Sequence, residues 1–307
     1  MSAFRSALAA LWIVGVLCVS NSAYAEDREL RYDLRIDLPV TGIAISWLLG
    51  SELAKADLAA MPCRWCDRRN DGTDSVNGFD STVRDALRWH DTGSADALSS
   101  VGAYGLAPIV AFGGLALAGA HDEALSRWPV DALVVTEAVA LATSVNQVVK
   151  FSFGRERPFV HVLPNADKLT TAQPSDNNTS FYSGHTSLAF SLAVAAGTVA
   201  TMRGYRWAPY VWASGLLVAG TTGYLRIAGD RHYATDVLAA AAFGSAIGFA
   251  VPYLFHRPLG NDGPTVGVTP VPGGAIVLLS WAPSSPGAGA GAARVRSEAV
   301  GPAELMD

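Results

Sequence analysis

The stretch that decides the fold runs from Arg226 to Phe255 and reads RIAGDRHYATDVLAAAAFGSAIGFAVPYLF. It opens with a short polar segment and continues as a long apolar run rich in alanine and glycine. Small residues of this kind let helices approach one another closely in a bilayer. The stretch therefore predicts an apolar helix with polar side chains gathered at its start.

The same pattern recurs along the second half of the chain. Hydrophobic residues make up 50% of the 307 residues and charged residues only 16%. A run at 38–50 is about thirteen residues long, too short to span a bilayer, and predicts a buried or interfacial helix. An amphipathic helix is expected at about 79–89. Long apolar segments, separated by polar connectors, occupy roughly 101–120, 131–149, 186–201, 208–225 and 235–255.

These segments predict an all-α fold, a membrane-embedded bundle. A soluble all-helical core built from the same segments is the alternative. The formal charge of −5 and the lack of a basic run argue against nucleic acid as a partner. No sequence feature indicates an oligomeric state.

The two ends of the chain differ from the middle. Residues 1–25 have the pattern of a secretory signal, with Arg5, an apolar stretch and a small-x-small site at Ala23-Tyr24-Ala25. An uncleaved first transmembrane helix is the alternative. Thr265 to Trp281 alternates loosely around a Pro-Gly-Gly turn and predicts a short β-hairpin, and 283–295 is expected to be disordered. The expected parts are a signal peptide at 1–25, an exported polar region at 26–100, a helical core at 101–256 and a largely irregular tail at 257–307.

Two cysteines remain after the expected signal, Cys63 and Cys66. An even number of cysteines in an exported chain favours a disulfide, here across a four-residue segment. The alternative to a structural disulfide is a redox-active Cys-x-x-Cys motif, but no thioredoxin-like βαβ pattern surrounds these cysteines. A metal site would need two more ligands nearby, and none is evident. We expect no metal and no cofactor.

Polar side chains that can take part in catalysis or ligand binding lie at the ends of the apolar segments. Lys150 ends one of them, where an ammonium is costly unless it meets an anion or water. Arg157 follows seven residues later, and its planar fork suits phosphoryl oxygens; Pro158 fixes the loop after it. Ser183 and Gly184 precede the helix that starts near His185, so a hydroxyl and free N–H groups lie at a positive helix end.

The third cluster, at the start of the quoted stretch, is the most informative. His232 and Asp236 are four residues apart, so on a helix they share one face and the carboxylate can accept from one imidazole nitrogen. That contact would fix the tautomer and leave the other nitrogen free to attack. Arg226 lies just before, placed to hold the same phosphate, and His185 is placed to act as acid or base. Each piece alone is commonplace, but their joint occurrence at helix boundaries is not.

Together these motifs resemble the type 2 phosphatidic acid phosphatase and vanadium haloperoxidase superfamily, whose signature is K-x6-RP, then P-S-G-H, then S-R-x5-H-x3-D. The matching positions are Lys150, Arg157, Pro158, Ser183, Gly184, His185, Arg226, His232 and Asp236. The resemblance covers about residues 100–256. It implies a six-helix core, with phosphate held by Lys150, Arg157, Ser183, Gly184 and Arg226. It also implies His232 as nucleophile, Asp236 as its orienting partner and His185 as general acid.

Two positions depart from that signature: Tyr182 stands where proline is usual, and Leu225 where serine is usual. The first is expected to loosen the turn that presents Ser183, and the second loses one phosphate contact. Neither removes a group that the mechanism requires. We therefore expect a metal-independent phosphatase, weaker or narrower in substrate.

A site at helix ends near the membrane interface suits a phosphate on an amphiphile, so the expected partners are a phosphorylated lipid and the membrane. If the signal is cleaved and 38–50 does not span, the 151–182 loop lies outside, and the site faces the periplasm from the inner membrane. If 38–50 spans, the site faces the cytoplasm. The alternatives are a soluble periplasmic acid phosphatase, a vanadate-dependent haloperoxidase and a non-catalytic membrane protein that binds anions.

Overall fold

The structure is a computed structural model that describes residues 28–69, 71–258, 263–271 and 274–282. The described residues fall into two units, a helical one within residues 28–258 and a second one within residues 263–282. The expected signal peptide and the expected disordered stretch at 283–295 lie outside the described residues.

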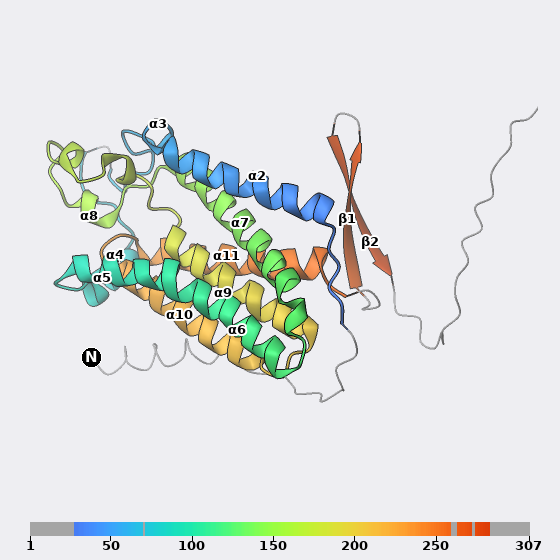
Figure 1. Ribbon diagram of the computed structural model, residues 1–307. Coiled ribbons are helices and arrows are strands. Elements are labelled where there is room, and N and C mark those ends of the chain that lie inside the picture. The colour runs from blue at the N-terminus through green and yellow to red at the C-terminus, as the bar shows by residue number, and fades with distance from the viewer. Residues whose placement is uncertain (1–27, 70, 259–262, 272–273, 283–307) are drawn as a thin grey trace, which may run out of the picture. The chain divides into compact units, whose positions relative to one another are not determined.

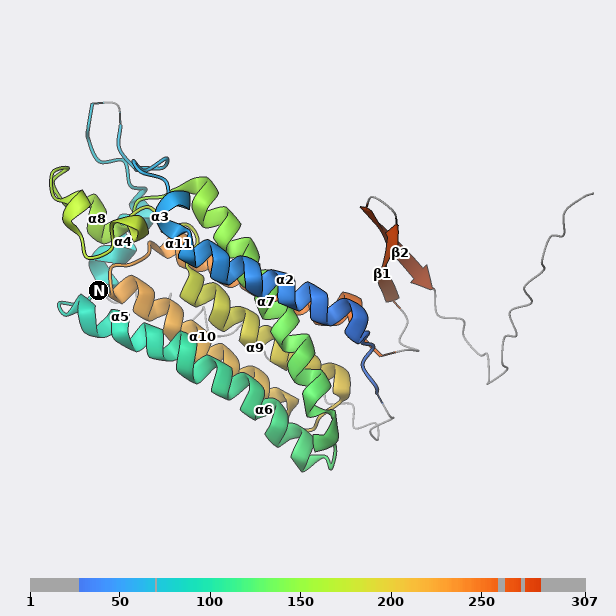
Figure 2. The ribbon, with the colours of Figure 1, turned by 45° about the horizontal axis from the view of Figure 1, so that its top comes forward.

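Six long helical segments form the first unit, and consecutive segments run in opposite directions (Figures 1 and 2). The second of them is continuous from Thr92 to His121, with a π-helical turn in its middle. The six are α2 (Leu34–Leu53), α5 (Thr92–Val101) with η1 (Gly102–Leu106) and α6 (Ala107–His121), α7 (Trp128–Phe153), α9 (Gly184–Arg203), α10 (Ala208–Ala228) and α11 (Ala234–Phe255).

Short helices connect the long ones. Apart from η2, they lie at the end of the bundle where α7 ends and α9 begins, on the left in Figure 1. They are α3 (Lys55–Leu58), α4 (Gly78–Leu87), η2 (Leu125–Arg127), α8 (Pro158–His161), η3 (Lys168–Thr170) and η4 (Pro174–Asp176). The disulfide Cys63–Cys66 lies in the connection between α3 and α4.

Helix α9 forms the centre of the bundle and packs against α6, α7, α10 and α11. Its contact with α11 is close because α11 carries glycines four residues apart. A Cβ atom on Gly244 would lie 2.6 Å from the Ser187 carbonyl oxygen, and one on Gly248 2.8 Å from that of Ser191. This G-x-x-x-G spacing lets the two backbones touch, which fixes the relation between the two helices whose first turns carry His185 and Asp236.

Helix α7 ends one turn after Lys150. Gly154 has φ +56°, a left-handed conformation that closes the helix. A Cβ atom there would lie 2.7 Å from that of Ala60, so glycine is required by both conformation and space. The chain therefore turns immediately into the loop that carries Arg157.

Helix α2 corrects one expectation from the sequence. The apolar run at 38–50 was expected to be too short to span a bilayer, but the helix is 20 residues long and meets the length and hydropathy of a span. It begins earlier because the Asp33 side chain caps it, accepting from Arg35 N at 2.9 Å. It also continues past Gly50 to Leu53, and it packs along α7. Counting only the uninterrupted apolar residues underestimated the length of the helix.

Five of the described helices are long and apolar enough to cross a membrane. Their outward side chains include many large apolar ones; Ile43 is 71% exposed, Ile109 67% and Leu238 51%. Exposed apolar surface on several helices is typical of a membrane protein. The expected all-α membrane fold is confirmed, with the apolar segments in their expected order.

The second unit contains the expected hairpin. Strand β1 (Gly263–Val271) pairs antiparallel with β2 (Gly274–Ala282), and Val271 lies opposite Gly274.

Candidate active site

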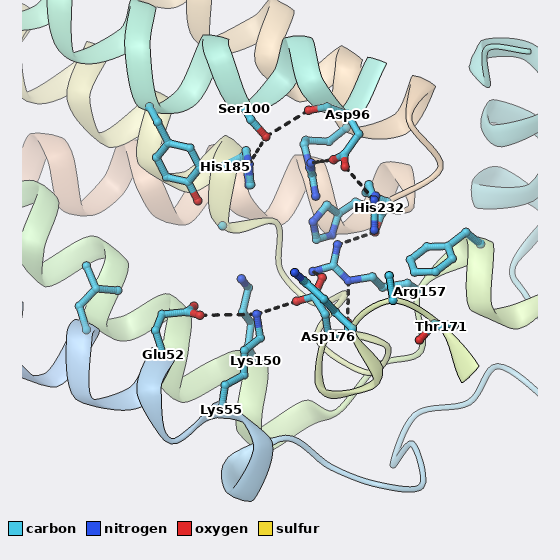
Figure 3. A pocket seen from close by; sticks show the side chains of 18 of the residues that line it. Glu52, Lys55, Asp96, Ser100, Lys150, Arg157, Thr171, Asp176, His185 and His232 are labelled. Atoms are coloured by element: carbon cyan, nitrogen blue, oxygen red, sulfur yellow. Dashed lines mark hydrogen bonds and ion pairs between the residues drawn. The ribbon is translucent and has the colours of Figure 1, made fainter. Parts of the chain in front are cut away.

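A cavity of ≈ 650 Å³ opens at the end of the bundle where the polar motifs lie (Figure 3). Side chains from α2, α5, α7, α9 and α10 and from the loops after α7 and α10 line it. Six of the eight residues expected from the sequence are among them, namely Lys150, Arg157, Gly184, His185, Arg226 and His232. Ser183 and Asp236 lie behind the cavity wall.

Lys150 presents an ammonium group to this cavity. The side chain is half-buried, and no ion pair joins it to any other described residue. Gly184 makes room for it, because a Cβ atom at that position would lie 2.8 Å from the Lys150 Nζ. An unpaired cation beside the N-terminus of α9 is suited to an anionic ligand.

Arg157 is buried and held on several sides. Its Nε donates to the Asp176 carbonyl oxygen at 2.8 Å, and its Nη2 lies 2.8 Å from the Asp176 carboxylate. Lys55 reaches the same carboxylate at 2.7 Å. Burial alone would raise the pKa of Asp176, but Arg157 and Lys55 outweigh it and hold that pKa well below its usual range. The carboxylate is ionised and keeps both cations in place.

Arg226 is fixed in the same way from the opposite wall. Its Nη1 donates to the Asp96 carboxylate and, at 2.9 Å, to the Ser99 hydroxyl. Arg231 contacts the other Asp96 oxygen at 2.7 Å. Around the whole cavity there are five lysines and arginines and three carboxylates. With neutral histidines the lining is positive by two charges, which matches a phosphate dianion.

His232 lies between these cations and is 2% exposed. Its Nδ1 hydrogen-bonds to the Ser180 carbonyl oxygen at 2.8 Å, and a carbonyl can only accept. The proton of the neutral ring is therefore on Nδ1, and Nε2 keeps its lone pair. Burial, and then the nearby Arg157 and Arg226, lower the pKa of His232 well below its usual value. The ring is a neutral base before any anion arrives.

His185 lines the cavity from the first turn of α9. Its Nε2 lies 3.2 Å from the Ser100 hydroxyl, and the Tyr104 ring packs edge-on against the imidazole at 4.8 Å. Ser100 donates to the Asp96 carbonyl oxygen at 3.1 Å, so its own oxygen is free to accept from Nε2–H. Residues on α5 and η1 thus orient the second imidazole.

Residues 131–259 match the family model described as the PAP2 superfamily. This stretch is a PAP2 superfamily domain. The resemblance expected from the motifs is confirmed for it. The chain is also 34% identical over 118 residues to a protein named lipid A 1-phosphatase from Porphyromonas gingivalis. That match covers 38% of this chain and 22% of the relative, so it spans about a fifth of the relative's length.

Within the PAP2 domain, Asp236 does not contact His232 as expected. Its carboxylate lies 3.9 Å from Nδ1, beyond hydrogen-bonding distance. The reason is local: α11 begins at Ala234, and Tyr233 is an extended N-cap residue, so residues 232 and 236 are not one helical turn apart. Asp236 instead accepts from the Ser180 hydroxyl at 2.6 Å and from Tyr233 N at 2.9 Å. Ser180 links the two residues, because its hydroxyl donates to Asp236 and its carbonyl oxygen holds the His232 ring.

Ser183 also differs from the expected phosphate contact. It is the N-cap residue of α9, and its hydroxyl accepts from the Thr186 hydroxyl at 2.9 Å. The two unusual residues of the PAP2 signature point into the protein: Tyr182 stacks on Phe243 with ring centroids 5.3 Å apart, and Leu225 packs against Ala95 and Ala228. Neither side chain lines the cavity.

Arg155 supports the PAP2 site from behind. It is fully buried and binds three carboxylates, Asp67 at 3.0 Å, Asp80 at 2.9 Å and Asp236 at 2.7 Å. Its guanidinium also stacks on the Trp65 ring at 4.2 Å. This cluster ties the region before α5 to the first turn of α11.

Sequence reasoning missed several residues that line the cavity. Asp96, Ser100 and Tyr104 are spaced four apart on one continuous helix, a periodicity that places them on one face and is visible in the sequence. Lys55, Asp176 and Arg231 carry no such signal, because only the folded loops bring them to the cavity.

A second, smaller cavity of ≈ 320 Å³ adjoins the PAP2 site. The two cavities share Leu48, Glu52, Tyr104, Lys150 and Gly184. Beyond these, α2 and α9 line it with Ile45 and Leu188, and α7 with residues such as Thr136 and Val139. The lining is mostly apolar, and it runs along the membrane-crossing part of the bundle.

Proposed function

We propose that this protein is a membrane phosphatase that hydrolyses a phosphomonoester or diphosphate of a lipid-like substrate through a phosphohistidine on His232. The observation that carries the proposal is the cavity in which two imidazoles face three cations of the PAP2 signature. One of those imidazoles is a buried neutral base whose second nitrogen is already committed to a carbonyl.

The reaction follows from these groups. The phosphoryl oxygens bind Lys150, Arg157 and Arg226, which neutralise the charge on the transferred group. The Nε2 lone pair of His232 forms a bond to phosphorus while the bond from phosphorus to the leaving oxygen breaks. His185, which is protonated once the phosphate dianion is bound beside it, gives that proton to the leaving oxygen and becomes neutral. The imidazolium formed on His232 is stabilised by the Ser180 carbonyl at Nδ1.

The second step reverses the proton transfer. His185 takes a proton from water, whose oxygen attacks phosphorus as the bond from Nε2 breaks. Orthophosphate leaves, His232 is neutral again, and His185 again carries the proton that it gave up in the first step. The lysine and arginines can supply the charge stabilisation that a metal ion supplies elsewhere, so we propose that this chemistry needs no metal.

Three observations support a lipid as substrate. The adjoining cavity offers an apolar surface to the rest of an amphiphile whose phosphate lies among the cations. The surrounding helices are long enough to cross a bilayer. The relative from Porphyromonas gingivalis is named for a lipid phosphate. We propose further that the site faces the outer side of the inner membrane. Because α2 is long enough to cross, this orientation places residues 28–33 on the inner side.

The test is phosphate release by the purified protein, in detergent micelles and without added metal. The substrates are phosphatidic acid, phosphatidylglycerol phosphate, a polyprenyl diphosphate and lipid A, compared with p-nitrophenyl phosphate. We expect faster turnover of at least one lipid. His232→Ala should lose more than about 10³-fold in kcat, whereas exposed His90 replaced by alanine is the matched control and should retain activity.

A radiolabelled phosphate should appear on His232 in wild-type protein during turnover, in a form stable to alkali and labile to acid. Undiminished turnover by the His232→Ala variant would refute the nucleophile. Turnover of soluble esters alone would favour the soluble acid phosphatase class, and vanadate-dependent bromination without hydrolysis the haloperoxidase class.

A further inference from the structure

Three titratable side chains converge toward the end of the bundle opposite the cavity. Asp37 comes from the first turn of α2, Glu137 from α7, and His256 directly follows α11. They are 6%, 6% and 2% exposed. One ligand atom of each lies within 4.8 Å of the others. None of them takes part in the chemistry proposed above.

The imidazole of His256 is oriented by the backbone. Its Nδ1 hydrogen-bonds to the Arg31 carbonyl oxygen at 2.9 Å, which places the proton of the neutral ring on Nδ1 and directs the Nε2 lone pair inward. Histidines that bind metals commonly donate their other ring N–H to a carbonyl in this way. Asp37 is also oriented, since one of its oxygens accepts from Asp33 N at 2.8 Å.

Two buried atoms of the cluster face each other without a hydrogen bond. The Nε2 of His256 and the Oε2 of Glu137 are 3.4 Å apart, and neither has a hydrogen-bond partner in the described part of the chain. With the ring neutral, these are two lone pairs directed at one another. Such an arrangement requires a proton or a cation between them.

The charges of the cluster distinguish those two occupants. A proton on Nε2 would balance one carboxylate and leave the other buried without a counter-charge, because no lysine or arginine of the described residues forms an ion pair with Asp37 or Glu137. Another buried acid on α7 has its counter-charge within the protein. The Asp131 carboxylate lies 2.7 Å from Arg203 Nε, and both residues are at most 1% exposed. A divalent cation balances both carboxylates of the open cluster at once.

We propose that Asp37, Glu137 and His256 form a binding site for one divalent transition-metal ion, and Zn²⁺ is the ion to test. One imidazole nitrogen and two carboxylates are ligands that Zn²⁺ accepts, with water in the fourth position. Mg²⁺ and Ca²⁺ prefer six or more oxygen ligands, so they fit the set less well. The bound ion joins α2 to α7 and to the end of α11. Its role is structural, and the opposite end of α2 forms a wall of both cavities.

The experiment uses the full-length protein in detergent, stripped with a chelator, desalted and titrated with ZnCl₂. Bound zinc is measured by elemental analysis after gel filtration, and the melting temperature is followed in parallel. We expect one zinc ion per chain and a rise in melting temperature. His256→Ala and Glu137→Gln should each weaken zinc binding at least about tenfold. His185→Ala and His121→Ala, which change other histidines, should bind zinc as the wild type does.

Failure of the wild type to bind one equivalent, or unchanged affinity in His256→Ala, would overturn the proposal. Should both ligand variants fail to fold, X-ray absorption on the zinc-loaded wild type decides. One imidazole nitrogen with oxygen ligands supports the site; sulfur, or two or more imidazoles, overturns it. Because the readout is metal content, the outcome is independent of whether the chain is a phosphatase.

Discussion

At the residue scale, the carboxylate of Asp236 holds several parts of the site together. It accepts from Arg155, from the Ser180 hydroxyl and from the backbone N–H of Tyr233. Ser180 is the residue whose carbonyl fixes the His232 ring. The position of the proposed nucleophile therefore depends on a group that does not touch it.

Replacing Asp236 by asparagine tests this dependence. The amide keeps the shape of the carboxylate, but its NH2 group would lie against Arg155 or the Ser180 hydroxyl, which are themselves donors. Ser180 should therefore shift, and its carbonyl oxygen should move His232 with it. We expect kcat to fall about 10²-fold, the scale of a misplacement near 1 Å, with a smaller change in KM. Asp167→Asn, at an exposed loop position, is the control. A kcat equal to that of the control would contradict the positioning role.

The pH dependence of kcat/KM follows from His232. Its pKa is lowered in the free protein, so the ring stays unprotonated as the pH falls through 6.5, the ordinary value for histidine. We expect no loss of kcat/KM from this group between pH 7 and 5, once the ionisation of the substrate phosphate is taken into account. A decline that follows a pKa near 6.5 and belongs to the enzyme would contradict a desolvated nucleophile.

At the element scale, α2 and α7 form walls of the apolar cavity beside the site. Thr136 lies on α7 and lines that cavity. Thr136→Phe should fill part of that cavity and lower kcat/KM for a long-chain lipid phosphate about tenfold. The kcat/KM for p-nitrophenyl phosphate should not change. The matched control on the same helix is Val148→Phe, at a position 51% exposed and outside both cavities. Equal losses for both substrates would mean that the cavity holds no lipid chain.

The elements themselves were largely predictable, because long apolar runs bounded by glycine, proline and charge need no tertiary information. Helices α7, α9, α10 and α11 begin and end within a few residues of the expected segments, and the polar motifs lie at their ends. Helix α2 was underestimated because its ends are polar. The contact between His232 and Asp236 was predicted from helical spacing, which does not apply before the helix begins. Lys55, at the start of α3, and Asp176, at the end of η4, are far apart in the sequence, and only tertiary structure brings them together.

At the scale of the whole molecule, the antiparallel order of the helices determines which segments share a side of the membrane. Helix α2 starts at the end opposite the cavity and ends beside it (Figure 1). A crossing α2 therefore puts residues 28–33 and the cavity on opposite sides. If the signal is cleaved, residues 28–33 lie outside, and a crossing α2 then puts the cavity on the inner side. A cleaved signal and an outward-facing cavity therefore cannot both be true when α2 crosses.

Reporter fusions after residue 30 and after residue 165 test this arrangement. We expect opposite sides of the membrane for the two positions, with residue 165 outside if the proposed orientation is correct. Residue 165 lies in the loop between α8 and η3, next to the site, and a fusion after residue 255 should report the same side as residue 30. Residues 30 and 165 on one side would mean that α2 does not cross.

The surplus of two positive charges around the cavity would also act after the proposed reaction. Orthophosphate carries the same three oxygens and much of the charge of the group that bound, so the lining attracts the product as it attracts the substrate. For a phosphatase built in this way, departure of the product sets an upper limit on turnover. Free phosphate in the surroundings would then compete for the site, and the proposed phosphatase would work fastest where phosphate is scarce.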